Sequence, residues 1–229
     1  MTKTIAITGC SRGIGKETVR NLLETGHEVI ALSRNCDSLQ ALKEKYTKMT
    51  TLDLDISDQK GRQAVVEFLE GRGKALDGIV HNAGMLLNKP FAETSIQDMM
   101  DVYQVNVFSV AELTRRLLPF FNPKAHVVAI SSMGGIQGSM KFAGLAAYSS
   151  SKGALITLME LLAEEYKEKG LSFNTLALGA VQTEMLNEAF PGYQASVSAE
   201  TMGACVAEFA VKGHQLYNGK VLQVSNSTP

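Results

Sequence analysis

Short apolar, β-branched runs alternate with longer helical patterns along nearly the whole chain. Continuous apolar strands between helices are typical of a parallel sheet covered on both faces, and right-handed crossovers wind such a sheet in both directions. We therefore expect an α/β fold with a Rossmann-type, doubly wound parallel sheet of about seven strands. Strands are expected at 4–8, 28–32, 50–54, 77–81, 125–131, 171–178 and 220–224, and helices at 13–24, 57–71, 95–120, 145–169 and 199–211.

Composition narrows the class of protein. Without repeats or a Pro-, Gly- or Ser-rich linker, residues 1–229 are expected to form one domain, with a short loop at about 184–198. A net charge of -1 argues against nucleic-acid binding, and no apolar run reaches the roughly 18 residues of a membrane helix. The apolar "TIAIT" near the first residue is expected to belong to the fold and not to a leader. Three cysteines without CxxC spacing and four scattered histidines predict a cytoplasmic protein without a metal site.

The stretch "TGCSRGIG" places Gly9, Gly13 and Gly15 between the first strand and the first helix. Glycines let a backbone turn tightly and approach a pyrophosphate, whose charge meets the N–H groups at the start of the helix. The spacing differs from the GxGxxG of the usual dinucleotide fingerprint, and a simple tight turn is the alternative. Its position after the first strand of an α/β sheet favours a nucleotide site.

The end of the second strand bears on the choice of cofactor. An acidic residue there would bind the ribose 2′-OH of NAD, whereas arginine suits the 2′-phosphate of NADP. The chain has Ser33 and Arg34 at this point, no carboxylate until Asp37, and Arg12 in the glycine-rich loop. The alternative is that both arginines are solvated surface charges. NADP(H) is predicted in preference to NAD(H).

Tyr148 and Lys152 are four residues apart and project from one face of the predicted helix. A free tyrosine titrates near pKa 10, and a neighbouring ammonium favours the phenolate. The motif alone is weak, because solvated Tyr–Lys pairs are common. Ser131 and Ser132 end a central strand, at the edge where doubly wound sheets bind ligands, and a hydroxyl there could hydrogen-bond a substrate carbonyl.

Together these motifs resemble the short-chain dehydrogenase/reductase family over nearly the whole chain. In the family's order they are "TGCSRGIG", "DIS" with Asp55, "HNAG" with Asn82, "YQVNVFS" with Asn106, "ISS" with Ser132, Tyr148 with Lys152, and "LGAVQTEM" with Thr183. The resemblance implies that Tyr148 donates the proton, Lys152 lowers its pKa and binds the nicotinamide ribose, and Ser132 holds the substrate oxygen. It implies that Asn106 kinks its helix and supports a water chain to the lysine. Cofactor contacts are expected from Gly9, Ser11, Arg12, Gly13, Ile14, Gly15, Ser33, Arg34, Asp55, Ile56, Asn82, Ala83, Gly84, Tyr148, Lys152, Gly179, Val181 and Thr183.

Two departures from the family pattern concern the substrate pocket. Ser132 and Tyr148 are 16 positions apart, a few more than is usual, so "GSMKFAGLAAY" is expected to be a small insertion; Ser131 and Ser139 are lesser candidates for the serine role. Leu178 replaces the usual proline before Gly179, which predicts a less rigid turn over the nicotinamide.

The predicted activity is NADPH-dependent, reversible reduction of a small ketone or aldehyde to an alcohol. One alternative is a 3-oxoacyl-[acyl-carrier-protein] reductase, which a basic rim containing Lys89, Lys141 or Arg115/Arg116 would favour. A less favoured alternative is a non-catalytic NADP-binding sensor. The helix at 95–120 is apolar on more than one face, which core packing or a subunit interface would explain. A homodimer or homotetramer is expected.

Overall fold

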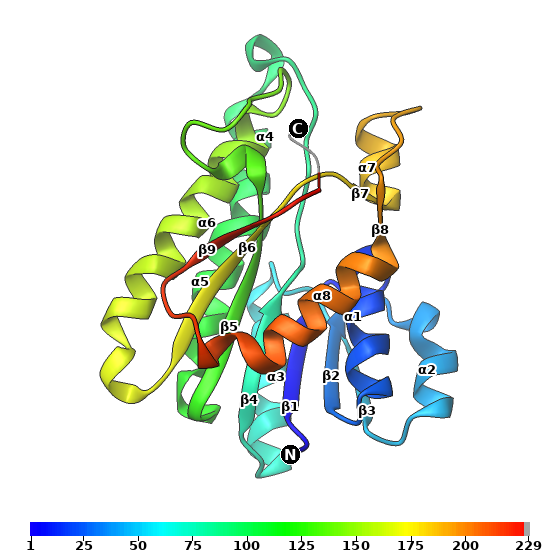
Figure 1. The fold of residues 1–229 in the computed structure, drawn as a ribbon, viewed down its shortest axis with the longest axis vertical. Helices are drawn as coiled ribbons and strands as arrows, with labels where there is room; N and C mark the ends of the chain where they lie inside the picture. The colour runs from blue at the N-terminus through cyan, green and yellow to red at the C-terminus, as the bar shows by residue number, and fades with distance from the viewer. Residues whose placement is uncertain (227–229) are drawn as a thin grey trace.

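The computed structural model describes residues 1–226; the last three residues of the expected domain lie outside this range. Seven parallel strands form one sheet in the order β3-β2-β1-β4-β5-β6-β9 (Figure 1). The order reverses between β1 and β4, and such a switch point opens a crevice at the carboxyl edge. This confirms the predicted doubly wound sheet. The strands are β1 (Thr4–Thr8), β2 (Glu28–Ser33), β3 (Met49–Asp53), β4 (Leu76–His81), β5 (Phe121–Ser132), β6 (Ser172–Leu178) and β9 (Val221–Val224).

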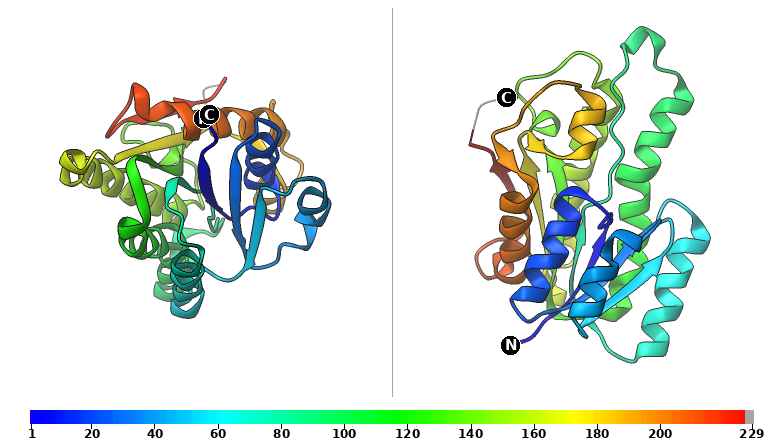
Figure 2. Two further views of the ribbon diagram at one scale, coloured as in Figure 1. Left: turned by 90° about the horizontal axis from the view of Figure 1, so that it is seen from below. Right: turned by 90° about the vertical axis from the view of Figure 1, so that its right-hand side faces the viewer.

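Helices cover both faces of the sheet (Figure 2). A hydrophobic core lies on each face of the sheet, and alternate residues of a strand point into the two cores. In β1, Ile5 and Ile7 face one core and Ala6 faces the other. Both faces are therefore dry, which explains the uninterrupted apolar strands. The first core is closed by α1 (Gly13–Glu24), α2 (Gln40–Lys45) and α8 (Ala199–Lys212), and the second by α3 (Gln59–Arg72), α5 (Ser109–Leu117) and α6 (Ala146–Glu165).

The helix expected at 95–120 is interrupted. It consists of α4 (Ile96–Tyr103), a π-helical turn at Gln104–Phe108 and α5, and a 3-10 turn at Leu118–Phe120 leads into β5 four residues earlier than expected. Apolar periodicity continues through the π turn and does not reveal it, whereas the kink that the resemblance implies at Asn106 lies within it. The helix expected at 145–169 likewise ends its α-helical part at Glu165 and continues as a 3-10 turn at Lys167–Lys169.

The apolar residues of this interrupted helix form two groups, one buried and one exposed. Val102, Leu113 and Leu117 are fully buried in the protein. Met100 and Phe108 are exposed, together with Ile96 at the start of α4 and Phe91 before it. Core packing therefore explains only part of the pattern.

The segment expected as a short loop at 184–198 contains regular structure. It includes α7 (Glu184–Ala189), and β7 (Val181–Gln182) pairs in parallel with β8 (Val197–Ser198). Thr183 caps α7 by accepting a hydrogen bond from the Leu186 N–H at 3.2 Å. In Figure 1, α7 lies beyond the N-terminal end of α1, at the carboxyl edge of the sheet. Elements as short as α7 and α2 carry too few periods to stand out in a sequence.

Three further observations concern membrane helices, metal ligands and thiols. Within residues 1–226, no helix is long and apolar enough to cross a lipid bilayer. The same part of the chain holds no group of three histidine, cysteine or acidic side chains placed to share a metal ion. Cys10 and Cys36 are buried free thiols, and Cys205 is an exposed one.

Candidate active site

The glycine-rich loop after β1 packs directly on the loop after β4. Gly9 has φ +69°, and a Cβ placed on it would lie 2.6 Å from the Ala83 Cα. A Cβ on Gly15 would lie 2.3 Å from the Gly9 carbonyl oxygen. Since such contacts are too short for any side chain, only glycine allows the two loops to meet.

Hydrogen bonds hold this contact together. The Asn82 side chain donates from Nδ2 to the carbonyl oxygens of Gly9 (2.8 Å) and Thr8 (3.2 Å). The Thr8 hydroxyl accepts the N–H groups of Asn82 and Ala83, each at 3.1 Å. The Asn82 side chain, expected from the sequence to contact the cofactor, is thus bonded to the glycine-rich loop. Thr8 was not predicted; the only available signal was its place as the last residue of a strand.

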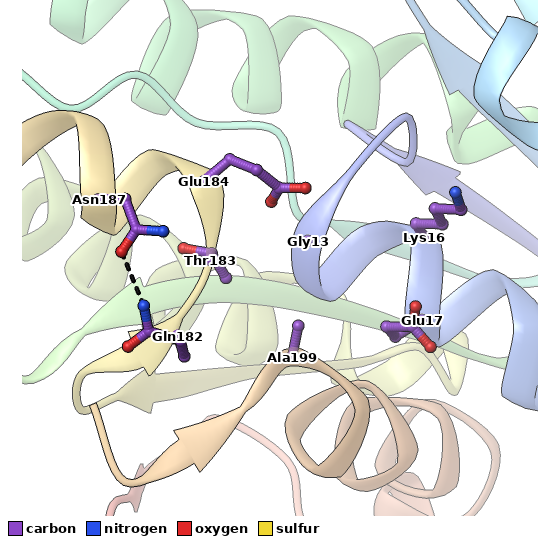
Figure 3. Close-up of a pocket in the computed structure, with 8 residues that line it drawn as sticks. All are labelled: Gly13, Lys16, Glu17, Gln182, Thr183, Glu184, Asn187 and Ala199. Carbon is purple, nitrogen blue, oxygen red and sulfur yellow. Dashed lines mark hydrogen bonds between the residues drawn. The ribbon is translucent and has the colours of Figure 1, made fainter. Parts of the chain in front are cut away.

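The start of α1 fits a dinucleotide pyrophosphate. Among the described residues, no side chain caps its first turn and no acidic residue lies in that turn, so its N–H groups remain available to an anion. Gly13 faces Thr183 across a pocket of about 310 Å³, with Glu184, Lys16 and other residues in its wall (Figure 3). A methyl group on Gly13 would lie 3.3 Å from Thr183 Cγ2.

The remaining predicted cofactor positions flank this loop. Ser33 is buried at the end of β2, whereas Arg34 is exposed and forms no ion pair within residues 1–226. The Ser11 carbonyl accepts a hydrogen bond from the Ser38 hydroxyl, which ties the loop to the segment after β2. Asp55 accepts bonds from the N–H (2.8 Å) and hydroxyl (2.7 Å) of Ser57. Of the others, Ile56 and Val181 are buried, Ile14 packs against the first core, and the Gly179 N–H donates to the Val224 carbonyl at 3.0 Å.

Tyr148 and Lys152 lie on the first two turns of α6, whose neighbours are β5 and β6. The Lys152 Nζ lies 5.8 Å from the centroid of the Tyr148 ring and donates a hydrogen bond to the Ile130 carbonyl at 2.8 Å. The Lys152 side chain is buried, and burial lowers its pKa to about 8. No residue type in the sequence indicates this carbonyl, because every residue of a strand has one.

Burial raises the pKa of Tyr148 to about 12, and a hydrogen bond with Ser132 opposes the shift. The phenol therefore carries its proton at neutral pH, as a proton donor must. The resemblance to the family implies that Lys152 lowers this pKa. In the structure desolvation dominates, and Ser132 is the group that favours the phenolate.

Asn106 is fully buried in the π turn and makes three hydrogen bonds. Its Oδ1 accepts the Met85 N–H at 2.8 Å, and its Nδ2 donates to the Met85 carbonyl and to Ser151 Oγ, both at 2.9 Å. A Cβ on Gly84 would lie 3.4 Å from both Asn106 Oδ1 and Lys152 Nζ. The structure thus brings Asn106, Gly84 and Lys152 together beside β4.

The three candidate serines differ in what their hydroxyls do. Ser131 donates to the Lys152 carbonyl at 2.9 Å, and Ser139 donates to the Met133 carbonyl at 2.6 Å. Ser132 accepts the Gly134 N–H at 3.2 Å and is the serine whose side chain opposes the rise in the pKa of Tyr148. The first two serines hold backbone in place, which favours Ser132 for the substrate.

The sequence model of the short chain dehydrogenase family matches residues 3–194, which is most of the chain. The chain belongs to this family. Membership implies a nicotinamide cofactor and an oxidoreductase activity, and the seven-stranded sheet agrees with the fold of solved members.

Curated relatives and solved structures agree with this assignment. An uncharacterized oxidoreductase of Escherichia coli is 34% identical over 199 residues, covering 82% of this chain and 77% of the relative. An NADPH-dependent pterin aldehyde reductase of Arabidopsis thaliana is 32% identical over 213 residues, covering 87% of each. In fold, a 4-hydroxyisoleucine dehydrogenase complexed with NADH superposes with a TM-score of 0.88 at 22% identity, covering 99% of this chain and 98% of that one.

Proposed function

We propose that this short-chain dehydrogenase reduces the carbonyl of a small ketone or aldehyde to an alcohol with NADPH, and catalyses the reverse reaction. The observation that carries the proposal is the position of Tyr148 beside the buried ammonium of Lys152, whose Nζ lies 5.8 Å from the centroid of the tyrosine ring. Burial raises the pKa of the phenol, and Ser132 opposes the rise. A proton donor and a hydroxyl beside one strand end can together bind a carbonyl oxygen as its negative charge grows.

Each residue of the site has a distinct task in this mechanism. The bound nicotinamide supplies the hydride, and this chain supplies placement and proton transfer. Tyr148 gives its hydroxyl proton to the carbonyl oxygen, while the Ser132 hydroxyl holds that oxygen. Lys152 stabilises the phenolate that remains and binds the nicotinamide ribose. Asn106 positions Lys152 through the loop at Gly84.

The preference for NADPH rests on arginines near the end of β2. Arg34 is exposed there and free of an ion pair among the described residues, and the side chain of Arg12 extends from the glycine-rich loop nearby. Arginine suits a phosphate because its planar fork can make two hydrogen bonds at once. The NADPH-dependent relative of Arabidopsis thaliana supports the same preference.

The carrier-protein alternative would be favoured by free cations near the cleft, and three of the four candidate cations have an acidic partner. Lys89 pairs with Asp98 at 2.8 Å, and Arg115 and Arg116 both pair with Glu112. Lys141 donates to the Ile136 carbonyl and to Ser139 Oγ, both at 2.6 Å.

We also propose that the protein acts in the cytoplasm as a homodimer or homotetramer. The exposed apolar residues Phe91, Ile96, Met100 and Phe108 support a subunit contact along α4 and the π turn. Sedimentation of the wild type and of Phe108→Ser tests this, with a smaller species expected for the variant. The unpaired thiols support a reducing compartment.

The test of activity is consumption of NADPH against a panel of aldehydes, ketones and acetoacetyl thioesters. We expect turnover of free carbonyl compounds, and we expect Tyr148→Phe to abolish it. Preferential thioester turnover would favour the 3-oxoacyl reductase. Tight NADPH binding with no turnover of any carbonyl would favour the non-catalytic sensor.

A further inference from the structure

Arg12, which the proposed function assigns to the cofactor, already has an anionic partner. Both of its terminal nitrogens contact the Glu188 carboxylate of α7, with NH2 3.0 Å from Oε2. The hydrogen bonds that Arg12 donates to Glu188, with the negative charges of Glu188 and Glu184, hold the pKa of Arg12 above its ordinary value. The two side chains remain 49% and 61% exposed, so water can replace either partner and the pair can exchange readily.

The glycine-rich loop that carries Arg12 lies between two places, the end of β2 and the start of α7. The Gly9 N–H donates to the Leu32 carbonyl of β2 at 2.9 Å, and Ser38 bonds to the Ser11 carbonyl. These bonds keep the glycine-rich loop beside the end of β2, where a 2′-phosphate would meet Arg34. On its other side, the loop faces Thr183 and α7 across the pocket of Figure 3.

One guanidinium cannot give the same pair of N–H groups to a carboxylate and to a phosphate. We infer that Glu188 sets the preference between NADPH and NADH, because it competes with the 2′-phosphate for Arg12. This inference rests on the proposed use of NADP(H) and adds the residue that limits it. NADH lacks the phosphate, so its binding leaves the Arg12–Glu188 pair intact.

The competition also affects α7. Its far end is held separately, because Asn88 Nδ2 donates to the Ala189 carbonyl at 2.9 Å. When Arg12 turns to a phosphate, α7 loses its ion pair to the glycine-rich loop and keeps the tie to Asn88. The position of α7 is therefore expected to depend on which cofactor is bound.

The test is isothermal titration of NADPH and NADH, at low salt and without a carbonyl substrate, into wild type and variants. We expect Glu188→Gln to tighten NADPH binding by about two- to five-fold, the range for an exposed ion pair, and to leave NADH binding unchanged. In an Arg12→Gln background the same substitution should change neither. Glu208→Gln, which removes a carboxylate from an exposed ion pair with Lys212 on α8, is the matched control and should also change neither.

Two kinds of result would overturn the inference, and they are distinguishable. Weaker or unchanged NADPH binding by Glu188→Gln, or equal tightening of both cofactors, refutes the competition while leaving the proposed NADPH preference standing. If Arg12→Gln binds NADPH as tightly as wild type, the role of Arg12 in the proposed function fails, and the inference fails with it.

Discussion

Replacing Asn106 with alanine tests whether its side chain holds the π turn in place. The side chain is fully buried and makes three hydrogen bonds, two to the Met85 backbone and one to Ser151. At about 1 kcal/mol for each bond, the variant should lose about 3 kcal/mol of unfolding free energy. For a domain of this size that corresponds to a melting temperature about 6–12 °C lower.

The assay is thermal unfolding followed by circular dichroism, with urea titration to obtain the free energy. Two variants calibrate the result. Ser151→Ala removes one of the three bonds, together with the donation from Ser151 Oγ to the Tyr148 carbonyl, and should have the smaller effect. Asn106→Asp keeps the acceptor for Met85 N–H and loses both donated bonds. A fall of about 2 °C or less is on the order of the effect of a single weak contact. If Asn106→Ala loses activity but its melting temperature falls by no more than that, the three hydrogen bonds do not support the π turn and the reasoning is refuted.

Three further predictions concern packing and pH. Gly9→Ala places a methyl group 2.6 Å from the Ala83 Cα at a positive φ, so NADPH affinity, measured by titration, should fall at least about tenfold; unchanged affinity would contradict the contact. Burial lowers the pKa of His81 and His126 to about 3, so below pH 6.5 the unfolded chain takes up protons that the native state refuses; urea titrations should show stability falling from pH 6.5 towards pH 3. Burial also lowers the pKa of Lys152 to about 8 from an ordinary value of 10.5, so between these values the native state has released a proton that the unfolded chain keeps. Wild type should therefore gain stability relative to Lys152→Met from pH 8 to 10.5, and a constant difference would argue against burial of the ammonium.

Much of the fold could be predicted because the signals are periodic. Most of the seven strands contain a short apolar run. The glycine-rich loop and the HNAG motif follow the carboxyl ends of β1 and β4, and YxxxK lies on the helix after β5. The π-helical form of the break at Gln104–Phe108 could not be read from periodicity. Only the resemblance indicated a kink at Asn106, whose hydrogen bonds reach residues 21 and 45 positions away.

The pKa values and ion pairs of the site were less predictable than the identity of its residues. The sequence places Lys152 one turn from Tyr148, which favours a lowered pKa for the tyrosine. Burial decides otherwise for Tyr148, and burial depends on the whole fold. In the same way, the sequence offers Arg12 as a free cation, whereas the structure pairs it with Glu188, 176 positions further along the chain.

The close contact between the loops after β1 and β4 has a consequence for protein engineering. Because Gly9 and Gly15 are fitted against Ala83 and Asn82 with no space for an added methyl group, the two loops form a single unit in two pieces. A glycine-rich loop grafted from another dehydrogenase would be shaped to fit the corresponding partner loop of that dehydrogenase, which the graft leaves behind. Recombination between relatives should therefore preserve function when both segments come from one parent, and crossovers placed between them should produce chains that fold poorly or bind no cofactor.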